Sequence, residues 1–275
     1  MSDGATPALA ADCWHLERIG RWNRAAAGEG IVVGVADSWL HPVDPALARA
    51  MSGVRAFAAD GSEADAAPLP TSHGTSVASL IAASAVGVAP CASLVFASVL
   101  RTPDGLGRFE ASPAQAAAGL RWLSRASVAG RPVRIINVSF TIADSPALRE
   151  AVAECLSAGI VMVAATGNDR QVVGYPAGYP GVVSVGALDR WDRLAAASGR
   201  SATAPDVWAP GMAVRALGAL GPRWVGGTSM AAAVVSGAIA AMMSARDGLH
   251  AGTIHAHLAR TARRHPSGER CVRIA

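Results

Sequence analysis

The chain has 275 residues, of which 51% are hydrophobic and only 16% are charged. This composition indicates one large, well-filled globular domain. The formal net charge is +4, and because the sequence contains no lysine, all 24 basic side chains are arginines. The arginines fall singly along the chain apart from one cluster (Arg260, Arg263 and Arg264, near His265), so the charge pattern excludes nucleic acid as the favoured partner. No repeat or low-complexity linker marks a domain boundary, and we expect one domain over residues 1–275.

The N-terminus has no features of a secretory signal. Met1 is followed by Ser2 and Asp3, without a basic region or an apolar run of signal-peptide length. We therefore expect no signal peptide and a cytoplasmic location, unless the chain is a trimmed form or is exported by a route other than the Sec pathway.

Strand-like and helix-like segments alternate along the chain. Apolar runs predict strands at 31–36, 93–99, 133–139, 160–165 and 181–185. Helices are expected at 74–84, 112–128, 145–158, 229–246 and 250–262. Apolar strands separated by helices predict an α/β fold, a three-layer sandwich with a mainly parallel central sheet and helices on both faces. Functional side chains should then gather at the carboxyl edge of the sheet.

One uncharged stretch, from Trp224 to Ala245, is long enough to suggest a membrane span. It contains several glycine, serine and threonine residues, and a buried central helix accounts for the same pattern. We therefore predict no membrane span.

The four cysteines are widely spaced along the chain. None forms a Cys-x-x-Cys pair, and no histidine lies at a spacing that suggests zinc. Thiols that are mostly buried are therefore predicted, with one disulfide bond between Cys13 and Cys271 left open as an alternative. The four positions are Cys13, Cys91, Cys155 and Cys271.

Three polar residues stand where a strand ends or a helix begins. Asp37 ends the apolar run 31–35, while His73 and Ser229 each open an Ala/Gly-rich helical stretch. A strand end presents a carboxylate rigidly, and a helix start places polar groups beside unsatisfied N–H donors. An acid, a base and a nucleophile in the order Asp, His, Ser match one of the known chain orders of the nucleophilic triad.

These motifs and three others make the chain resemble the subtilases, the subtilisin-like serine endopeptidases. Residues 164–168 (Ala-Ala-Thr-Gly-Asn) resemble the oxyanion-hole motif of the family, and residues 173–176 (Val-Gly-Tyr-Pro) resemble the floor of its specificity pocket. Residues 209–211 (Ala-Pro-Gly) resemble its short turn ahead of the serine. The resemblance runs from about Trp14 to about Ala262, and it implies a single subtilisin-like catalytic domain.

The resemblance also implies a role for each residue. Ser229 attacks the peptide carbonyl after His73 takes its proton, while Asp37 orients the imidazole. Asn168 donates its side-chain amide to the oxyanion. A polypeptide substrate is implied, and no cofactor is required.

Substrate contacts are expected on two sides of the triad. The segment that resembles the substrate-pairing strand contains Ser139, Phe140 and Thr141, and Gly105 and Gly107 are expected on the opposite rim. The pocket for the residue before the cut bond is expected at Ala165, Gly167 and Gly174, with an apolar preference.

The sequence departs from the family pattern at two positions near the site. Trp39 stands where glycine is usual, so a positive φ there would be strained and a large ring would lie beside the triad. Thr141 also replaces a glycine, and its side chain would narrow the cleft or change the pairing with substrate. The segment after His73 lacks the Asn-rich loop of calcium-binding relatives, so no tight calcium site is predicted, and a weak site built from backbone carbonyls remains open.

Only about 13 residues precede the first family-like segment, so no prodomain is expected. These features favour a peptide-bond hydrolase, and we expect one dedicated to peptide maturation. Two alternatives stay open. The protein is a catalytically silent subtilase-like binding or regulatory protein, or it is a peptide ligase or macrocyclase that passes the same acyl-enzyme to an amine. The sequence leaves the oligomeric state unknown.

Overall fold

The centre of the molecule is a mainly parallel β-sheet. The computed structural model describes residues 12–41, 45–65, 72–101, 110–169, 172–201 and 203–274. Within these ranges the strands follow the order β12-β13-β9-β8-β7-β6-β1-β4-β2-β3, and β5 adds to β6. The strands of this sheet are β1 (Val32–Asp37), β2 (Met51–Phe57), β3 (Glu63–Ala64), β4 (Ser93–Ser98), β5 (Ser127–Val128), β6 (Arg131–Val138), β7 (Val161–Ala165), β8 (Val183–Leu188), β9 (Val207–Pro210), β12 (Arg263–Arg264) and β13 (Arg270–Cys271).

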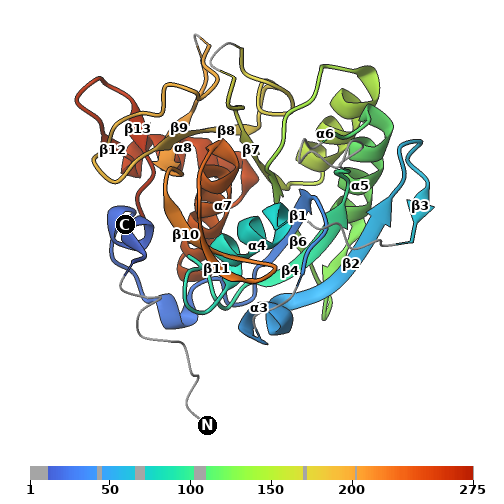
Figure 1. The fold of residues 1–275 in the computed structure, drawn as a ribbon, viewed down its shortest axis with the longest axis horizontal. Helices are drawn as coiled ribbons and strands as arrows, with labels where there is room; N and C mark the ends of the chain where they lie inside the picture. The colour runs from blue at the N-terminus through green and yellow to red at the C-terminus, as the bar shows by residue number, and fades with distance from the viewer. Residues whose placement is uncertain are drawn as a thin grey trace.

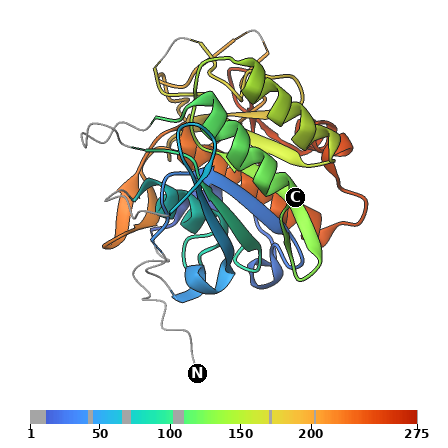
Figure 2. The ribbon, with the colours of Figure 1, turned by 90° about the vertical axis from the view of Figure 1, so that its right-hand side faces the viewer.

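Helices cover both faces of the sheet, as the alternation of segments predicts. Figure 1 shows α4 and α7 on one side of the central strands and α5 and α6 on the other, and Figure 2 shows the second pair in green in front of the strands. The helical segments are α2 (Trp14–Arg18), η1 (Arg24–Ala26), α3 (Pro45–Ala50), α4 (His73–Ala82), α5 (Pro113–Arg125), α6 (Pro146–Ser157), α7 (Thr228–Ala245) and α8 (Ala251–Thr261).

Alternate residues of each central strand enter two different cores. In β1, Val33 and Val35 pack with α4 and α7, whereas Val32 and Ala36 pack with α5 and α6. A strand buried on both faces has to be apolar throughout, and this is the pattern that identified it in the sequence. The predicted α/β three-layer architecture is therefore confirmed.

The register of the parallel strands brings their carboxyl ends to one edge. Asp37 at the end of β1 pairs with Ser98 at the end of β4. On the other side, Ala36 pairs with Val138, the last residue of β6. The chain therefore leaves the strands at neighbouring points, and the residues that follow them meet.

The helix predicted at 112–128 ends earlier, at Arg125. Residues 127–128 instead form β5, which turns back through Ala129 and Gly130 and pairs with the start of β6. Both turn residues have positive φ, which a helix cannot accommodate and a tight hairpin requires. The structure also contains strands that were not expected from the sequence, namely β2, β9 and the hairpin formed by β10 (Val214–Gly218) and β11 (Gly221–Val225).

α7 is the one helix in the described part of the chain that is long and apolar enough to cross a membrane. In this structure 83% of that apolar window is buried inside the domain. A central core helix accounts for the apolar stretch.

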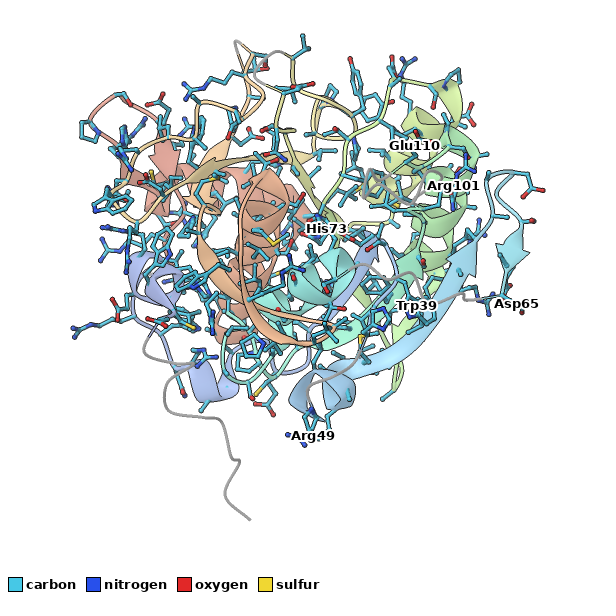
Figure 3. All side chains as sticks on the ribbon, in the orientation of Figure 1. Trp39, Arg49, Asp65, His73, Arg101 and Glu110 are labelled. Carbon is cyan, nitrogen blue, oxygen red and sulfur yellow. The ribbon has the colours of Figure 1, made fainter. Side chains whose placement is uncertain are left out.

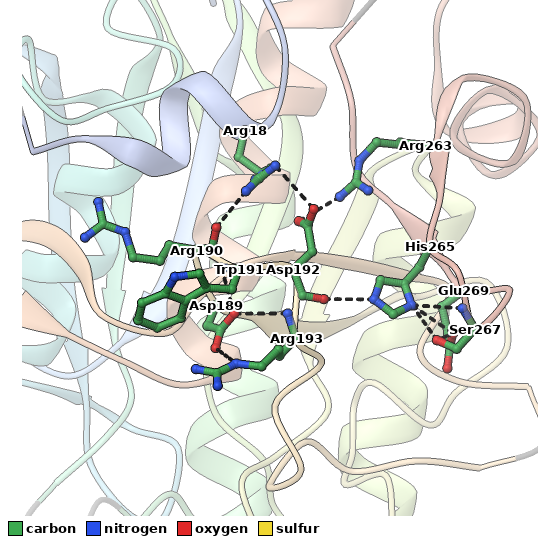
Figure 4. Close-up of polar contacts among 10 residues, drawn as sticks. All are labelled: Arg18, Asp189, Arg190, Trp191, Asp192, Arg193, Arg263, His265, Ser267 and Glu269. Atoms are coloured by element: carbon green, nitrogen blue, oxygen red, sulfur yellow. Dashed lines mark hydrogen bonds and ion pairs between the residues drawn. The ribbon is translucent and has the colours of Figure 1, made fainter.

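An ion-pair network joins segments from the two ends of the chain (Figure 4). Arg18 in α2 and Arg263 in β12 both bind the carboxylate of Asp192, over 3.2 and 2.8 Å. The His265 ring bonds to the Asp192 carbonyl oxygen over 2.8 Å. Part of the C-terminal basic cluster therefore pairs with an acid of the same chain.

None of the four cysteines, all of which lie in the described ranges, forms a disulfide bond. Three of them are buried, and Cys91 is exposed. The alternative of a Cys13 to Cys271 disulfide is therefore not realised in this structure.

Candidate active site

Three elements bring the candidate catalytic residues together. β1 ends at Asp37, α4 begins at His73, and Ser229 is the second residue of α7. Gly74 allows the start of α4 to lie against the chain leaving β1, because a Cβ there would meet the Ser38 carbonyl oxygen at 2.7 Å. Figure 3 shows His73 near the middle of this side of the molecule, beside β1 and α4.

Asp37 and His73 form a short hydrogen bond. His73 Nδ1 lies 2.7 Å from Asp37 Oδ1, and the Ser38 backbone N–H donates to the same oxygen over 2.6 Å. The Asp37 side chain is fully buried, whereas the His73 side chain is 19% exposed. The imidazole therefore covers the carboxylate, and part of the imidazole is exposed to solvent.

Opposing effects act on the pKa of His73. Burial lowers it, but the negative charge of Asp37 and the hydrogen bond to it raise it, while the positive charge of Arg223 lowers it. The net shift in the pKa of His73 is upward. Asp37 Oδ2 is also buried and has no hydrogen-bond partner among the described residues. The imidazole is thus the principal group that compensates the carboxylate charge.

Ser229 lies at the start of the buried helix α7 and is 9% exposed. Its hydroxyl donates to the Ser139 carbonyl oxygen over 2.8 Å. The Ser139 hydroxyl donates in return to the Ser229 carbonyl oxygen over 2.8 Å. This reciprocal pair ties α7 to the end of β6. Because a serine hydroxyl carries one proton, that proton has to turn from Ser139 to His73 before Ser229 can act as a nucleophile.

The amide of Asn168 is oriented through its carbonyl oxygen. Asn168 Oδ1 accepts hydrogen bonds from the Thr228 backbone N–H over 3.0 Å and from the Thr228 hydroxyl over 3.3 Å. Thr228 Oγ1 in turn accepts from the Gly167 N–H over 3.2 Å. With Oδ1 used in this way, the NH₂ group is the part of Asn168 that can donate to a ligand in the cavity.

One cavity of about 330 Å³ connects these groups. It is lined by His73, Leu100, Ser139, Phe140, Thr141, Ala165, Gly167, Asn168, Gly226, Thr228 and Ser229. The structure therefore brings together eight of the residues that sequence analysis proposed for the site, with Asp37 behind His73. Gly174 is not among the lining residues, and Gly105 and Gly107 lie outside the described residues.

Leu100 and Gly226 also line the cavity and were not among the site residues expected from the sequence. Leu100 follows β4, the neighbour of β1, so a correct prediction of strand order would have placed it at this edge. Gly226 directly precedes the glycine of the serine motif, and that adjacency was the available signal.

Trp39 differs from what its sequence position suggested. The described non-glycine residues with positive φ are Ala129, Asp192 and Ala213, so Trp39 carries no such strain. It is half-buried and does not line the cavity, and Figure 3 shows it apart from His73. Trp39 therefore does not carry the strain that a positive φ would impose, and its ring does not line the cavity.

The described part of the chain contains no group of three or more His, Cys, Asp or Glu residues that could hold a metal ion. The chemistry of the cavity is carried by a carboxylate, an imidazole, a hydroxyl and an amide.

A parallel α/β domain with an acid, an imidazole and a hydroxyl at the carboxyl edge of its sheet has the arrangement of a serine hydrolase. Comparison with known proteins identifies the class. The profile of the Subtilase family matches residues 28–272. The chain therefore belongs to the subtilase family, and it is a subtilisin-like serine protease.

Two relatives illustrate the similarity in sequence. The chain is 31% identical over 241 residues to the major intracellular serine protease of Bacillus subtilis (strain 168), which covers 81% of this chain and 71% of the relative. It is 34% identical over 202 residues to subtilisin DY of Bacillus licheniformis, covering 69% of this chain and 70% of the relative.

Solved structures show the same fold. A protease of Pseudoalteromonas arctica PAMC 21717 superposes with a TM-score of 0.80 at 26% identity, covering 96% of each chain. A cold-adapted subtilisin-like serine proteinase superposes with a TM-score of 0.82 over 95% of this chain and 98% of the other, at 23% identity.

Proposed function

We propose that the protein is an endopeptidase that hydrolyses peptide bonds through an acyl-enzyme on Ser229. Asp37, His73 and Ser229 act as the triad, and Asn168 acts in the oxyanion hole. The observation that carries the proposal is the 2.7 Å bond between His73 and Asp37, at a cavity that Ser229 and Asn168 also line.

In the first half of the reaction, His73 takes the hydroxyl proton of Ser229 through Nε2, while Nδ1 stays bonded to Asp37. Ser229 Oγ forms a bond to the peptide carbonyl carbon, and the C–N bond then breaks as His73 gives its proton to the leaving amine. In the second half, water repeats these steps and releases the acid. The upward shift in the pKa of His73 supports its role as the base, because it strengthens the pull on the serine proton.

Negative charge on the substrate oxygen is met by donors that are in place before the reaction. The Asn168 amide is oriented by its two bonds to Thr228. The backbone N–H of Ser229 lies in the first turn of α7, where the helix dipole favours negative charge. Donors that need no rearrangement stabilise the tetrahedral intermediate more than mobile water can.

The substrate is an extended polypeptide. Ser139, Phe140 and Thr141 leave the sheet edge on one side of the cavity, and Ala165 and Gly167 lie on the other. Gly174 belongs to the wall behind Thr141. Catalysis needs no cofactor.

We also propose that the enzyme is dedicated to the maturation of a particular peptide and that it works in the cytoplasm, a reducing compartment. Support comes from the absence of disulfide bonds among the four cysteines, one of which is exposed. One relative carries the name of an intracellular serine protease.

The test is intact-mass detection of a fluorophosphonate adduct at pH 7 to 8. We expect one adduct per protein molecule, lost in both Ser229→Ala and His73→Ala. Circular dichroism of the two variants checks that the loss reflects chemistry and not unfolding. A folded wild-type protein that takes no label would contradict the proposal and favour a silent binding protein. Peptide products that carry a new amide bond, in place of a free carboxylate, would indicate a ligase.

A further inference from the structure

Thr141 follows the end of β6, and its side chain lies between Gly167 and Gly174. Backbone bonds fix this arrangement. The Ile142 backbone N–H donates to the Tyr175 carbonyl oxygen over 2.9 Å, and the Tyr175 N–H donates to the Ile142 carbonyl oxygen over 3.2 Å. The Gly174 N–H donates to the carbonyl of the residue before Gly167 over 3.2 Å. Three chain segments therefore meet around one threonine.

The threonine takes the space that a side chain at either glycine would need. A Cβ at Gly174 would lie 2.5 Å from Thr141 Cβ and 2.8 Å from its methyl carbon. A Cβ at Gly167 would lie 3.5 Å from the same methyl carbon. Contacts below 3.0 Å are not tolerated, so Thr141 is packed directly on Gly174 and spans the distance to Gly167.

The cavity ends at this threonine. Thr141 and Gly167 line the cavity that contains Ser229, and Gly174 does not. Thr141 is itself exposed and Gly174 is half-buried, and the Thr141 side chain stands between Gly174 and Gly167, which lines the cavity. With glycine at position 141, the space between Gly167 and Gly174 would open into the cavity.

The position of His73 determines which part of a substrate meets this wall. His73 has to reach the leaving nitrogen to protonate it, so the leaving half of the peptide lies toward His73. The acyl half then lies toward the walls formed by Ser139 to Thr141 and by Gly167. The side chain next to the scissile carbonyl therefore points at Thr141.

We infer that Thr141 restricts the residue before the scissile bond to a small side chain, namely glycine, alanine or serine. The inference rests on the proposed function, and it replaces the broad apolar preference expected from sequence. A leucine or phenylalanine side chain would have to displace Thr141 from Gly174. Backbone hydrogen bonds hold the segment that contains Thr141. Displacing Thr141 therefore costs free energy in the transition state as well as in the ground state, and it weakens binding of the large side chain in both.

The test uses peptidyl phosphonate diphenyl esters that differ only in the side chain beside phosphorus, alanine in one probe and phenylalanine in the other. Ser229 Oγ forms a bond to phosphorus, phenoxide leaves, and the hydroxyl proton passes through His73 to the phenoxide. Each adduct is followed by intact mass to give a second-order rate constant.

We expect wild-type protein to react roughly 10- to 100-fold faster with the alanine probe. Thr141→Gly should bring the two rate constants within about threefold of each other, because it opens the space over Gly174. Thr141→Val is the matched control. Valine keeps the shape of threonine without its hydroxyl, so this variant should retain the wild-type ratio.

A fluorophosphonate, which has no amino-acid side chain, separates the possible failures. Equal reactivity of the two peptidyl probes with wild-type protein that takes the fluorophosphonate would overturn the inference and leave the proposed function standing. So would a preference that persists in a Thr141→Gly variant with normal fluorophosphonate labelling. If Thr141→Gly does not fold, Thr141→Ser is used, and an unchanged ratio there overturns the inference. Wild-type protein that takes no fluorophosphonate removes the proposed function and this inference together.

Discussion

The two faces of the sheet are covered by helices of different kinds. α4 and α7 are buried along almost their whole length and consist mainly of alanine, serine, glycine and valine. α5 and α6 bury only one side each and carry charged residues on the other, with Arg121 in α5 bound to Glu154 in α6. His73 and Ser229 lie at the starts of the two buried helices. A helix enclosed on all sides has one allowed position, so this face holds the proposed catalytic groups in place, whereas the helices of the other face cover the sheet.

Small residues make the buried face possible. A Cβ at Gly237 in α7 would lie 2.7 Å from Val88 Cβ, so glycine is required for α7 to pack this closely. Exact packing of this kind tolerates little change. The following predictions test whether sensitivity to substitution is concentrated on the catalytic face.

The largest effect is expected at the cavity. Asn168→Ala should lower kcat by about 10²–10³, the loss found for the equivalent donor in subtilisin itself, with little change in KM. The reason is that the amide stabilises charge that develops only in the transition state. Steady-state kinetics with a cleaved peptide measures it. A kcat that stays within about threefold of wild type would exclude Asn168 from the oxyanion hole.

The next effect is on stability. Gly237→Ala should lower the free energy of unfolding by about 1–3 kcal/mol, because the added methyl group overpacks the contact with Val88. Urea denaturation followed by circular dichroism measures it. The double variant Gly237→Ala with Val88→Gly should lose less than the sum of the two single losses, because removing the Val88 side chain, including its Cβ, makes room for the methyl group added at position 237. An unchanged or higher stability in Gly237→Ala would mean that the helix gain from alanine outweighs packing here.

A substitution in α5 or α6, on the other face of the sheet, should lower the free energy of unfolding by a smaller amount. Arg121 Nε binds both oxygens of Glu154, over 2.9 and 3.0 Å, but both side chains are partly exposed. Solvent screens such a pair, so Arg121→Gln should cost only about 0.2–1 kcal/mol and leave kcat unchanged. A loss as large as that of Gly237→Ala would contradict the proposed difference between the two faces.

The smallest effect is a shift in pH dependence. His73 has to be neutral to accept the serine proton, so kcat/KM falls as the pH drops through the pKa of His73. Asp37 raises this pKa and Arg223 lowers it. Removing the positive charge in Arg223→Gln should therefore raise the pKa and move the acid limb to higher pH.

The pH profile is measured at low ionic strength, where an exposed charge acts most strongly, and again in high salt, where the shift should shrink. Arg121→Gln is the control and should keep the wild-type profile. Movement of the acid limb to lower pH in Arg223→Gln would show that Arg223 acts on His73 by some means other than its charge.

Much of the fold could be predicted from local pattern. The apolar runs that became β1, β4, β6, β7 and β8 are buried on both faces, so their composition alone identified them. β9 and β11 were missed because each is short and contains proline, which disfavours a strand in isolation. Pairing with a neighbour stabilises them, and a single sequence does not contain that information.

Some residues of the candidate site could likewise be proposed from the sequence, and others could not. Asp37, His73, Ser229 and Asn168 could be proposed from sequence, because each stands in a short motif at the end of a strand or the start of a helix. Leu100 could not, because its place depends on β4 lying beside β1.

The role inferred for Thr141 depends on both the local sequence and the tertiary structure. The sequence determined that a threonine stands where the resemblance to the family implies glycine, and it determined the order of acid, base and nucleophile. Only the tertiary structure decided that this side chain packs on Gly174, some thirty residues further along the chain, and closes the cavity there. The reason is physical: local pattern follows from the burial of each segment, whereas the width of a pocket depends on which distant backbone segments hydrogen bonds bring into contact.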